Sequence, residues 1–196
     1  MLHRLLLRFA LLALPALLAA CASGSGTAPF VVGESYHPGL QCAPFANQLS
    51  GIALYGDAGT WWREAVGRYR RTHVPEVGAV LVMGRQPRLP HGHVAVVSRV
   101  IGARELDVMQ ANWEPGMVDE DQLVIDVSPE NDWTRVRVWW PPAHSMGITT
   151  YRADGFILPP SPATHAELLR AVGPAARLGM VTVGRPPPRA RLVAGG

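Results

Sequence analysis

Cys42 is the residue whose chemistry most needs an explanation, because it is one of only two cysteines among 196 residues. It follows Gln41 and begins a stretch with helical spacing of apolar residues, so we expect it at a helix N-terminus. Backbone N–H groups and the positive end of the helix dipole favour a thiolate at that position. Cys42 is therefore a candidate nucleophile for acyl transfer, provided that a base lies beside it.

The base is best supplied by His93, which begins the apolar run His93-Val-Ala-Val-Val-Ser98. A strand of this kind can hold an imidazole rigidly at the rim of a sheet. His91 lies two residues earlier beside Gly92, in a looser segment, and is the weaker candidate. A zinc site made by Cys42, His91 and His93 is the alternative, but paired metal-ligand motifs are missing. We therefore expect neither a metal nor a cofactor.

A catalytic imidazole also needs a group that fixes its orientation. Gln110 and Asn112 end the next predicted strand and, two residues apart, are expected to share one face. The amide oxygen of either residue could accept a hydrogen bond from the ring nitrogen that faces away from Cys42. We favour Asn112 over Gln110, with Glu114 as a more distant carboxylate candidate, and the alternative is that both amides simply face solvent.

The first twenty residues have the features of an export signal. Arg4 and Arg8 precede an apolar run, Phe9 to Ala20, that is too short to span a bilayer. It ends in Leu18-Ala19-Ala20-Cys21, which resembles a bacterial lipobox, and Cys21 would then carry a lipid. Cys42 would be left as a lone thiol in an oxidising compartment. An ordinary signal peptide and a Cys21–Cys42 disulfide are the alternatives.

The pattern of elements predicts an α+β fold with N-terminal helices packed on a central antiparallel β-sheet. We expect helices at Cys42 to Ile52 and Trp61 to Arg70. The strands are expected in β-branched or alternating stretches, at residues 77–83, 93–98, 105–112, 134–140 and 155–158.

Composition divides the chain into four parts. We expect a signal peptide at 1–20, a flexible tether at 21–33, a catalytic domain at 34–158, and a Pro/Ala/Arg-rich tail at 159–196 with one possible helix, His165 to Leu178, followed by disorder. Removal of the signal lowers the formal net charge from +3 to +1. No basic stripe with interleaved aromatic residues is present, so we expect no nucleic-acid partner.

Taken in order, these stretches resemble the CHAP domain, a cysteine- and histidine-dependent amidohydrolase/peptidase of bacterial cell walls with a papain-like fold. The matching stretches are Gln41-Cys42 at a helix start, Trp61-Trp62 after a Gly/Ala-containing loop, the strand from Pro75, Gly92-His93 before an apolar run, and Gln110-Ala-Asn112-Trp113. The resemblance extends over about residues 36–158. Many members of the family have Glu where this chain has Gln110, and this departure leaves the third catalytic member open.

The resemblance implies that Cys42 attacks an amide carbonyl, that His93 acts as base and then acid, and that water cleaves a thioester. The Cys42 backbone N–H, with the Gln41 side chain, is the candidate oxyanion site. Trp61, Trp62 and Trp113 are candidates for contact with substrate, although aromatic residues at helical spacing are more often part of a core.

We therefore expect a peptidoglycan hydrolase, either an amidase or an endopeptidase, that is monomeric and binds wall peptides. Ala22, after the lipidated cysteine, favours attachment to the outer membrane, facing the periplasm. The alternative is a catalytically silent CHAP-like lipoprotein that binds wall peptides or a protein partner, and the change at Gln110 is the feature that supports it.

Overall fold

The computed structural model describes residues 41–172 and the backbone of residues 181–183. The predicted signal peptide, the lipobox with Cys21 and the tether lie outside the described residues. Within the described ranges, no helix is long and apolar enough to cross a membrane.

The chain forms three α-helices, two short 3-10 helices and ten strands within the described ranges. The helices are α1 (Cys42–Ser50), α2 (Trp61–Glu64) and α3 (His165–Val172), and the 3-10 turns are Ala58–Thr60 and Pro141–Ala143. The strands are β1 (Arg71–Thr72), β2 (Val80–Met83), β3 (His93–Gly102), β4 (Glu105–Ala111), β5 (Val118–Asp126), β6 (Arg135–Trp140), β7 (Ser145–Met146), β8 (Tyr151–Arg152), β9 (Gly155–Ile157) and β10 (Val181–Val183).

The strands join into one sheet in the order β1-β9-β2-β3-β4-β5-β6-β7, with β8 also paired to β6. All these pairings are antiparallel, whereas β10 pairs with β5 in parallel. The α+β class is therefore correct, and the sheet is mostly rather than entirely antiparallel.

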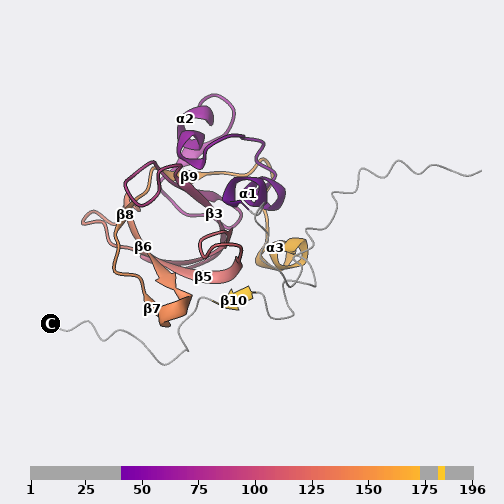
Figure 1. The fold of residues 1–196 in the computed structure, drawn as a ribbon. Coiled ribbons are helices and arrows are strands. Elements are labelled where there is room, and N and C mark those ends of the chain that lie inside the picture. Colours follow the sequence, from indigo (N-terminus) through magenta and orange to yellow (C-terminus); the bar gives the residue numbers. More distant parts are fainter. Residues whose placement is uncertain (1–40, 173–180, 184–196) are drawn as a thin grey trace, which may run out of the picture.

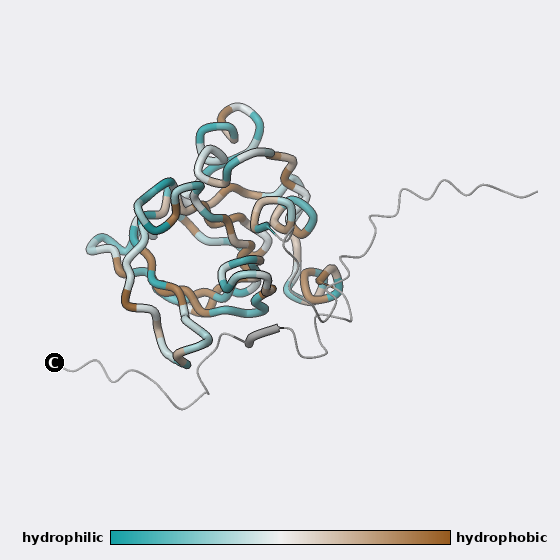
Figure 2. The backbone as a smooth tube through the Cα atoms, viewed as in Figure 1, coloured by the Kyte–Doolittle hydropathy of each residue, from teal (hydrophilic) through white to brown (hydrophobic). Residues whose placement is uncertain are grey.

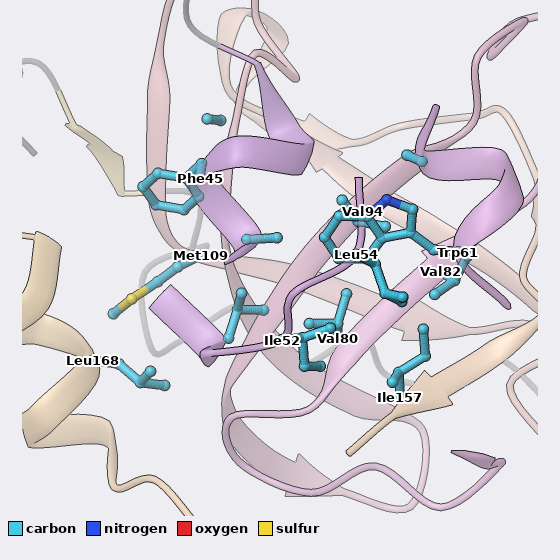
Figure 3. Packing of buried hydrophobic residues seen from close by; sticks show 14 of the residues in the cluster. Phe45, Ile52, Leu54, Trp61, Val80, Val82, Val94, Met109, Ile157 and Leu168 are labelled. Atoms are coloured by element: carbon cyan, nitrogen blue, oxygen red, sulfur yellow. The ribbon is translucent and has the colours of Figure 1, made fainter. Parts of the chain in front are cut away.

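One face of the sheet is covered by helices. Figure 1 shows α1 beside β3, with α3 next to α1. Apolar residues of α1 and the segment after it, including Phe45, Ile52 and Leu54, pack with Val80, Val94 and Met109 of the strands, as the close view in Figure 3 shows. This packing holds the N-terminus of α1 against the central strands.

The other face of the sheet encloses a second cluster, which includes Leu81, Val97, Val108 and Phe156. The ring centroids of Trp133, just before β6, and Phe156, in β9, lie 5.7 Å apart. The sheet is thus curved so that strands near its two ends meet over this cluster. Figure 2, coloured by the hydropathy of each residue, shows hydrophobic residues along many of the strands and hydrophilic residues in many of the connecting loops.

The structure corrects three expectations about the fold. The second helix is a single turn, and Gly67 has a φ of +71° where the prediction continued the helix. The helices are not all N-terminal, because α3 follows the sheet. Leu168 and Val172 of α3 are buried in the helix-side cluster, so the domain extends past the predicted boundary at 158.

Candidate active site

Cys42 is the first residue of α1, directly after the extended residue Gln41. Phe45 and Ala46, one turn further along, are buried against the sheet and fix the direction of the helix. Cys42 is a free thiol of intermediate exposure. Its position leaves the sulfur within reach of solvent while backbone N–H groups of the first turn point towards it.

His93 is the first residue of β3 and is paired with Met83 of β2. It is only 4% exposed. The preceding Gly92 has a φ of +71°, and a Cβ there would collide with the backbone of Gly59, so the chain can turn into the strand here only with glycine. The turn places the imidazole of His93 at the beginning of this central strand, next to the start of α1.

The two side chains shift each other's pKa. Burial by itself raises the pKa of the Cys42 thiol, but the charge and hydrogen bond of His93, with hydrogen bonds from the Val94 and Ala43 backbone, outweigh it and hold that pKa below its usual value. Burial by itself lowers the pKa of His93, yet the charge and hydrogen bond of Cys42 lead the effects that raise it above its usual value. The pair therefore favours a thiolate next to an imidazolium.

Gln110, and not Asn112, is the partner of the imidazole. The distance from His93 Nε2 to Gln110 Oε1 is 2.8 Å, and both side chains are buried. Because Nε2 is occupied in this way, Nδ1 is the ring nitrogen that faces Cys42. Our preference for Asn112 over Gln110 was therefore wrong in this structure.

Asn112 is turned away from His93 because it lies just past β4 with a φ of +62°, which breaks the alternation of a strand. Its Oδ1 accepts a hydrogen bond from the Gly116 backbone at 2.9 Å, and its Nδ2 lies 3.5 Å from Gln41 Oε1. Asn112 therefore links the turn after β4 to the residue that precedes the nucleophile. Glu114 lies in the same turn, where its carbonyl accepts a hydrogen bond from the Met117 backbone.

A buried row of amides continues beyond Gln110. Gln110 Nε2 donates a hydrogen bond to Gln122 Oε1, and Gln122 Nε2 donates to the backbone carbonyl of Trp139 at 2.9 Å. Neither Gln122 nor Asp119, a buried carboxylate that also raises the pKa of His93, was identified from the sequence. Both residues were missed because the acidic stretch at 119–121 does not have the pattern of a buried strand.

The three tryptophans proposed to contact substrate lie in different settings. Trp61 is fully buried in the helix-side cluster, so the expectation of a substrate contact does not hold for it. Trp62 is half-buried against Arg71, His73 and Gly155.

Trp113 is placed next to the candidate base, His93. Its ring centroid lies 5.0 Å from that of His93, in an edge-to-face arrangement. Trp113 also lines a cavity of about 350 Å³ together with Arg88, Trp140 and Tyr151.

His91 does not join the pair. Its Nδ1 lies 3.2 Å from Asp57 Oδ2, and its side chain is 75% exposed. Among the described residues, no group of three His, Cys, Asp or Glu side chains is arranged to hold a metal ion.

Residues 31–112 match the model of the CHAP domain. A search of curated proteins found no match. The matched segment contains Cys42, His93 and Gln110, the three side chains that the structure brings together. The chain thus carries a CHAP domain, a domain of peptidoglycan-related amidases and peptidases.

Proposed function

We propose that this protein hydrolyses amide bonds in peptidoglycan, with Cys42 as the nucleophile and His93 as the general base and acid. The observation that carries the proposal is the contact between a thiol at the start of α1 and a buried imidazole whose other nitrogen bonds Gln110. A helix bearing the nucleophile that packs on a sheet bearing the histidine also supports a papain-like relationship.

In the first half-reaction, the Cys42 sulfur attacks the carbonyl carbon of the scissile amide and forms a C–S bond. The imidazolium of His93 gives its Nδ1 proton to the leaving nitrogen as the C–N bond breaks. The products of this step are a free amine and a thioester at Cys42. Gln110 Oε1 accepts the Nε2–H of His93 throughout, so the ring keeps one orientation.

In the second half-reaction, His93 Nδ1 takes a proton from water, and the water oxygen attacks the thioester carbonyl. The C–S bond breaks, the acid product leaves, and Cys42 returns as a thiolate next to the protonated imidazole. The amide that was cut is thereby converted to a carboxylate and an amine, with one water consumed.

The negative oxygen formed in each step needs hydrogen-bond donors. The Cys42 backbone N–H is the first candidate, and the Gln41 side chain is the second. Asn112 Nδ2 approaches Gln41 Oε1 at 3.5 Å, which orients the amide of Gln41. The Nε2 group of Gln41 makes no hydrogen bond within the part of the chain that the structure describes, and we propose that it donates to the oxyanion.

The cavity beside Trp113 supports a peptidoglycan substrate. Trp140 and Tyr151 give it aromatic walls, which suit the apolar faces of sugar rings or short aliphatic side chains. Arg88 adds a positive charge that would pair with a carboxylate, and wall peptides carry such groups. We propose that the part of the substrate on one side of the scissile bond lies here.

We further propose that the mature protein is anchored by a lipid on Cys21 in the cell envelope, facing the periplasm. The lipobox-like sequence before Cys21 and the small, polar segment after it support this location. A tether of this kind would hold the hydrolase near its insoluble substrate.

The test is the digestion of purified sacculi by the full chain in detergent, with released fragments identified by mass spectrometry. The proposal expects fragments with new amine and carboxyl ends from the unmodified chain and none from Cys42→Ala. Identical fragment profiles from both proteins would contradict it. Binding of both proteins to sacculi without cleavage would instead support the silent CHAP-like module.

A further inference from the structure

The hydrogen-bonded row that starts at His93 crosses four neighbouring strands. His93 lies on β3, Gln110 on β4, Gln122 on β5, and the carbonyl of Trp139 on β6, and these strands are adjacent in the sheet. His93 and both glutamine side chains are buried. Gln122 lies outside residues 31–112, the segment that matches the CHAP domain model.

Gln122 reaches this row because β5 contains a bulge. Val108 pairs with Gln122 and Gln110 pairs with Asp119, so one residue of β4 faces two residues of β5 between these pairs. Asp121, in the bulge, has a φ of +54°. In a regular strand Asp119 and Gln122 would point to opposite faces, whereas the extra residue places both on the face of Gln110.

The bulge is held from the other face of the sheet. The carboxylate of Asp121 accepts hydrogen bonds from Ser98 Oγ at 2.7 Å and from Arg99 at 2.8 Å. His165 Nε2 of α3 lies 3.0 Å from the same carboxylate. The conformation that aims Gln122 at Gln110 is thus supported by contacts that do not involve the candidate active site.

The donor and acceptor roles along the row are fixed from the end farthest from His93, at Trp139. A backbone carbonyl can only accept hydrogen bonds, so Trp139 requires the Nε2 side of the Gln122 amide. This turns Gln122 Oε1 towards Gln110, and Gln110 must therefore donate a hydrogen bond to it from its own Nε2. Gln110 Oε1 is then the atom that faces His93 Nε2, and that nitrogen must carry a hydrogen.

We propose that Gln122 is a positioning residue that fixes the protonation pattern of His93 through the orientation of the Gln110 amide. Without Gln122, the two ends of the Gln110 amide are nearly equal in shape, and its NH₂ end could face the ring. That arrangement would oppose a hydrogen on Nε2 and so oppose the imidazolium that accompanies the Cys42 thiolate. A family member with a carboxylate in place of Gln110 would not need this control, because both of its oxygens accept.

This inference rests on the Cys42–His93 pair of the proposed function, and its test does not require a wall substrate. The readout is the rate at which iodoacetamide alkylates Cys42 in the full chain, measured from pH 5 to 9 by mass spectrometry of the peptide that carries Cys42. The ionisable groups that act on His93 in the structure are Cys42 and Asp119, and all variants retain both.

Gln122→Met keeps the volume of the side chain but cannot fix the Gln110 amide. We expect it to lower the alkylation rate at the acidic end of the profile by about ten-fold, which corresponds to a rise of about one pKa unit for the thiol. Gln122→Glu, which can accept from Gln110 and, when protonated, donate to the Trp139 carbonyl, should stay within about three-fold of the unmodified chain.

The decisive comparison repeats Gln122→Met in a Gln110→Glu background, where we expect a change of less than about three-fold because a carboxylate has no wrong orientation. Val108→Ala, a buried change opposite Gln122 but outside the row, is the matched control and should lower the melting temperature without moving the pH profile.

An unchanged profile in folded Gln122→Met would overturn the proposal. An equal loss in both backgrounds would also overturn it, because it would indicate a packing effect. Failure to digest sacculi would contradict the proposed function but would leave these alkylation results interpretable.

Discussion

Two histidines that are two residues apart have opposite environments, although a sequence pattern treats them alike. His93 is buried and joined to Cys42 and Gln110, whereas His91 is exposed and joined to Asp57. The hydrogen bond of His91, with Arg85 nearby, holds the pKa of Asp57 below its usual value even though that carboxylate is open to water.

The comparison shows that a charged partner is not enough to make a histidine chemically useful. Water screens the exposed cluster of Asp57, Arg85 and His91, so each of its contacts contributes little to the free energy of unfolding although together they shift the pKa of Asp57. In the buried row, low dielectric strengthens every interaction, and the neutral amide of Gln110 can influence the ionisation of His93. Variants of the two regions should therefore differ sharply in effect.

The largest effect is expected for His93. His93→Ala removes the base and acid, and we expect the rate of sacculus digestion to fall by about 10²- to 10⁴-fold. His93→Gln, which preserves more of the buried volume, should fall equally far. Retention of more than a tenth of the rate by either folded variant would contradict the assigned role.

The second-largest effect is expected for substitutions of Gln110. Gln110→Leu removes a hydrogen bond to a charged group, worth about 1.5–3 kcal/mol, and should lower kcat/KM by about 10- to 100-fold. Gln110→Glu should retain activity and raise the pKa of His93, so the alkaline limb of the pH–rate profile should move to higher pH. A larger loss of activity in Asn112→Ala than in Gln110→Leu, together with a shift of that limb, would contradict the assignment of Gln110 as the third member.

Substitutions in the cavity should have a smaller effect than those at Gln110, and they should act on KM. Trp140→Ala or Arg88→Ala should raise KM by about three- to ten-fold, or up to about 1.4 kcal/mol of binding, while the alkylation of Cys42 stays unchanged. Michaelis kinetics on soluble wall fragments would separate these constants. A fall in kcat at constant KM would argue that the cavity does not hold substrate.

The smallest effect is expected in the exposed cluster. His91→Ala should change the digestion rate by less than about two-fold, since an exposed pair contributes little. Because His91 and His93 are so close in the sequence, this variant is the matched control for His93→Ala. A large loss with normal folding would mean that the rim takes part in binding or catalysis.

The sequence was sufficient where local patterns decide structure. The helix at Cys42 and the strands at Val80, His93 and Glu105 follow from apolar periodicity and flanking glycines, and the structure has elements at each of these places. The placement of Cys42 and His93 side by side also agrees with the predicted pair.

The remaining features depend on backbone geometry that no pattern encodes. The positive φ of Asn112 turned the favoured third member away from His93. The bulge in β5 shifted the alternation of an acidic stretch, so the strand and Gln122 were both missed. Trp61 was misassigned because a large aromatic side chain at a predicted rim and one in a core have the same sequence signature.

The central claim is that His93, and not its neighbour His91, lowers the pKa of the Cys42 thiol. It is tested most directly by the pH dependence of Cys42 alkylation in the full chain, in His91→Ala and in His93→Ala. The structure predicts a midpoint below that of an ordinary thiol for the full chain and for His91→Ala, because the intact His93 lowers the pKa of the Cys42 thiol. For His93→Ala it predicts a higher midpoint than in these two proteins, because burial then raises that pKa against only the hydrogen bonds from the Val94 and Ala43 backbone. Three superimposable profiles would contradict the account.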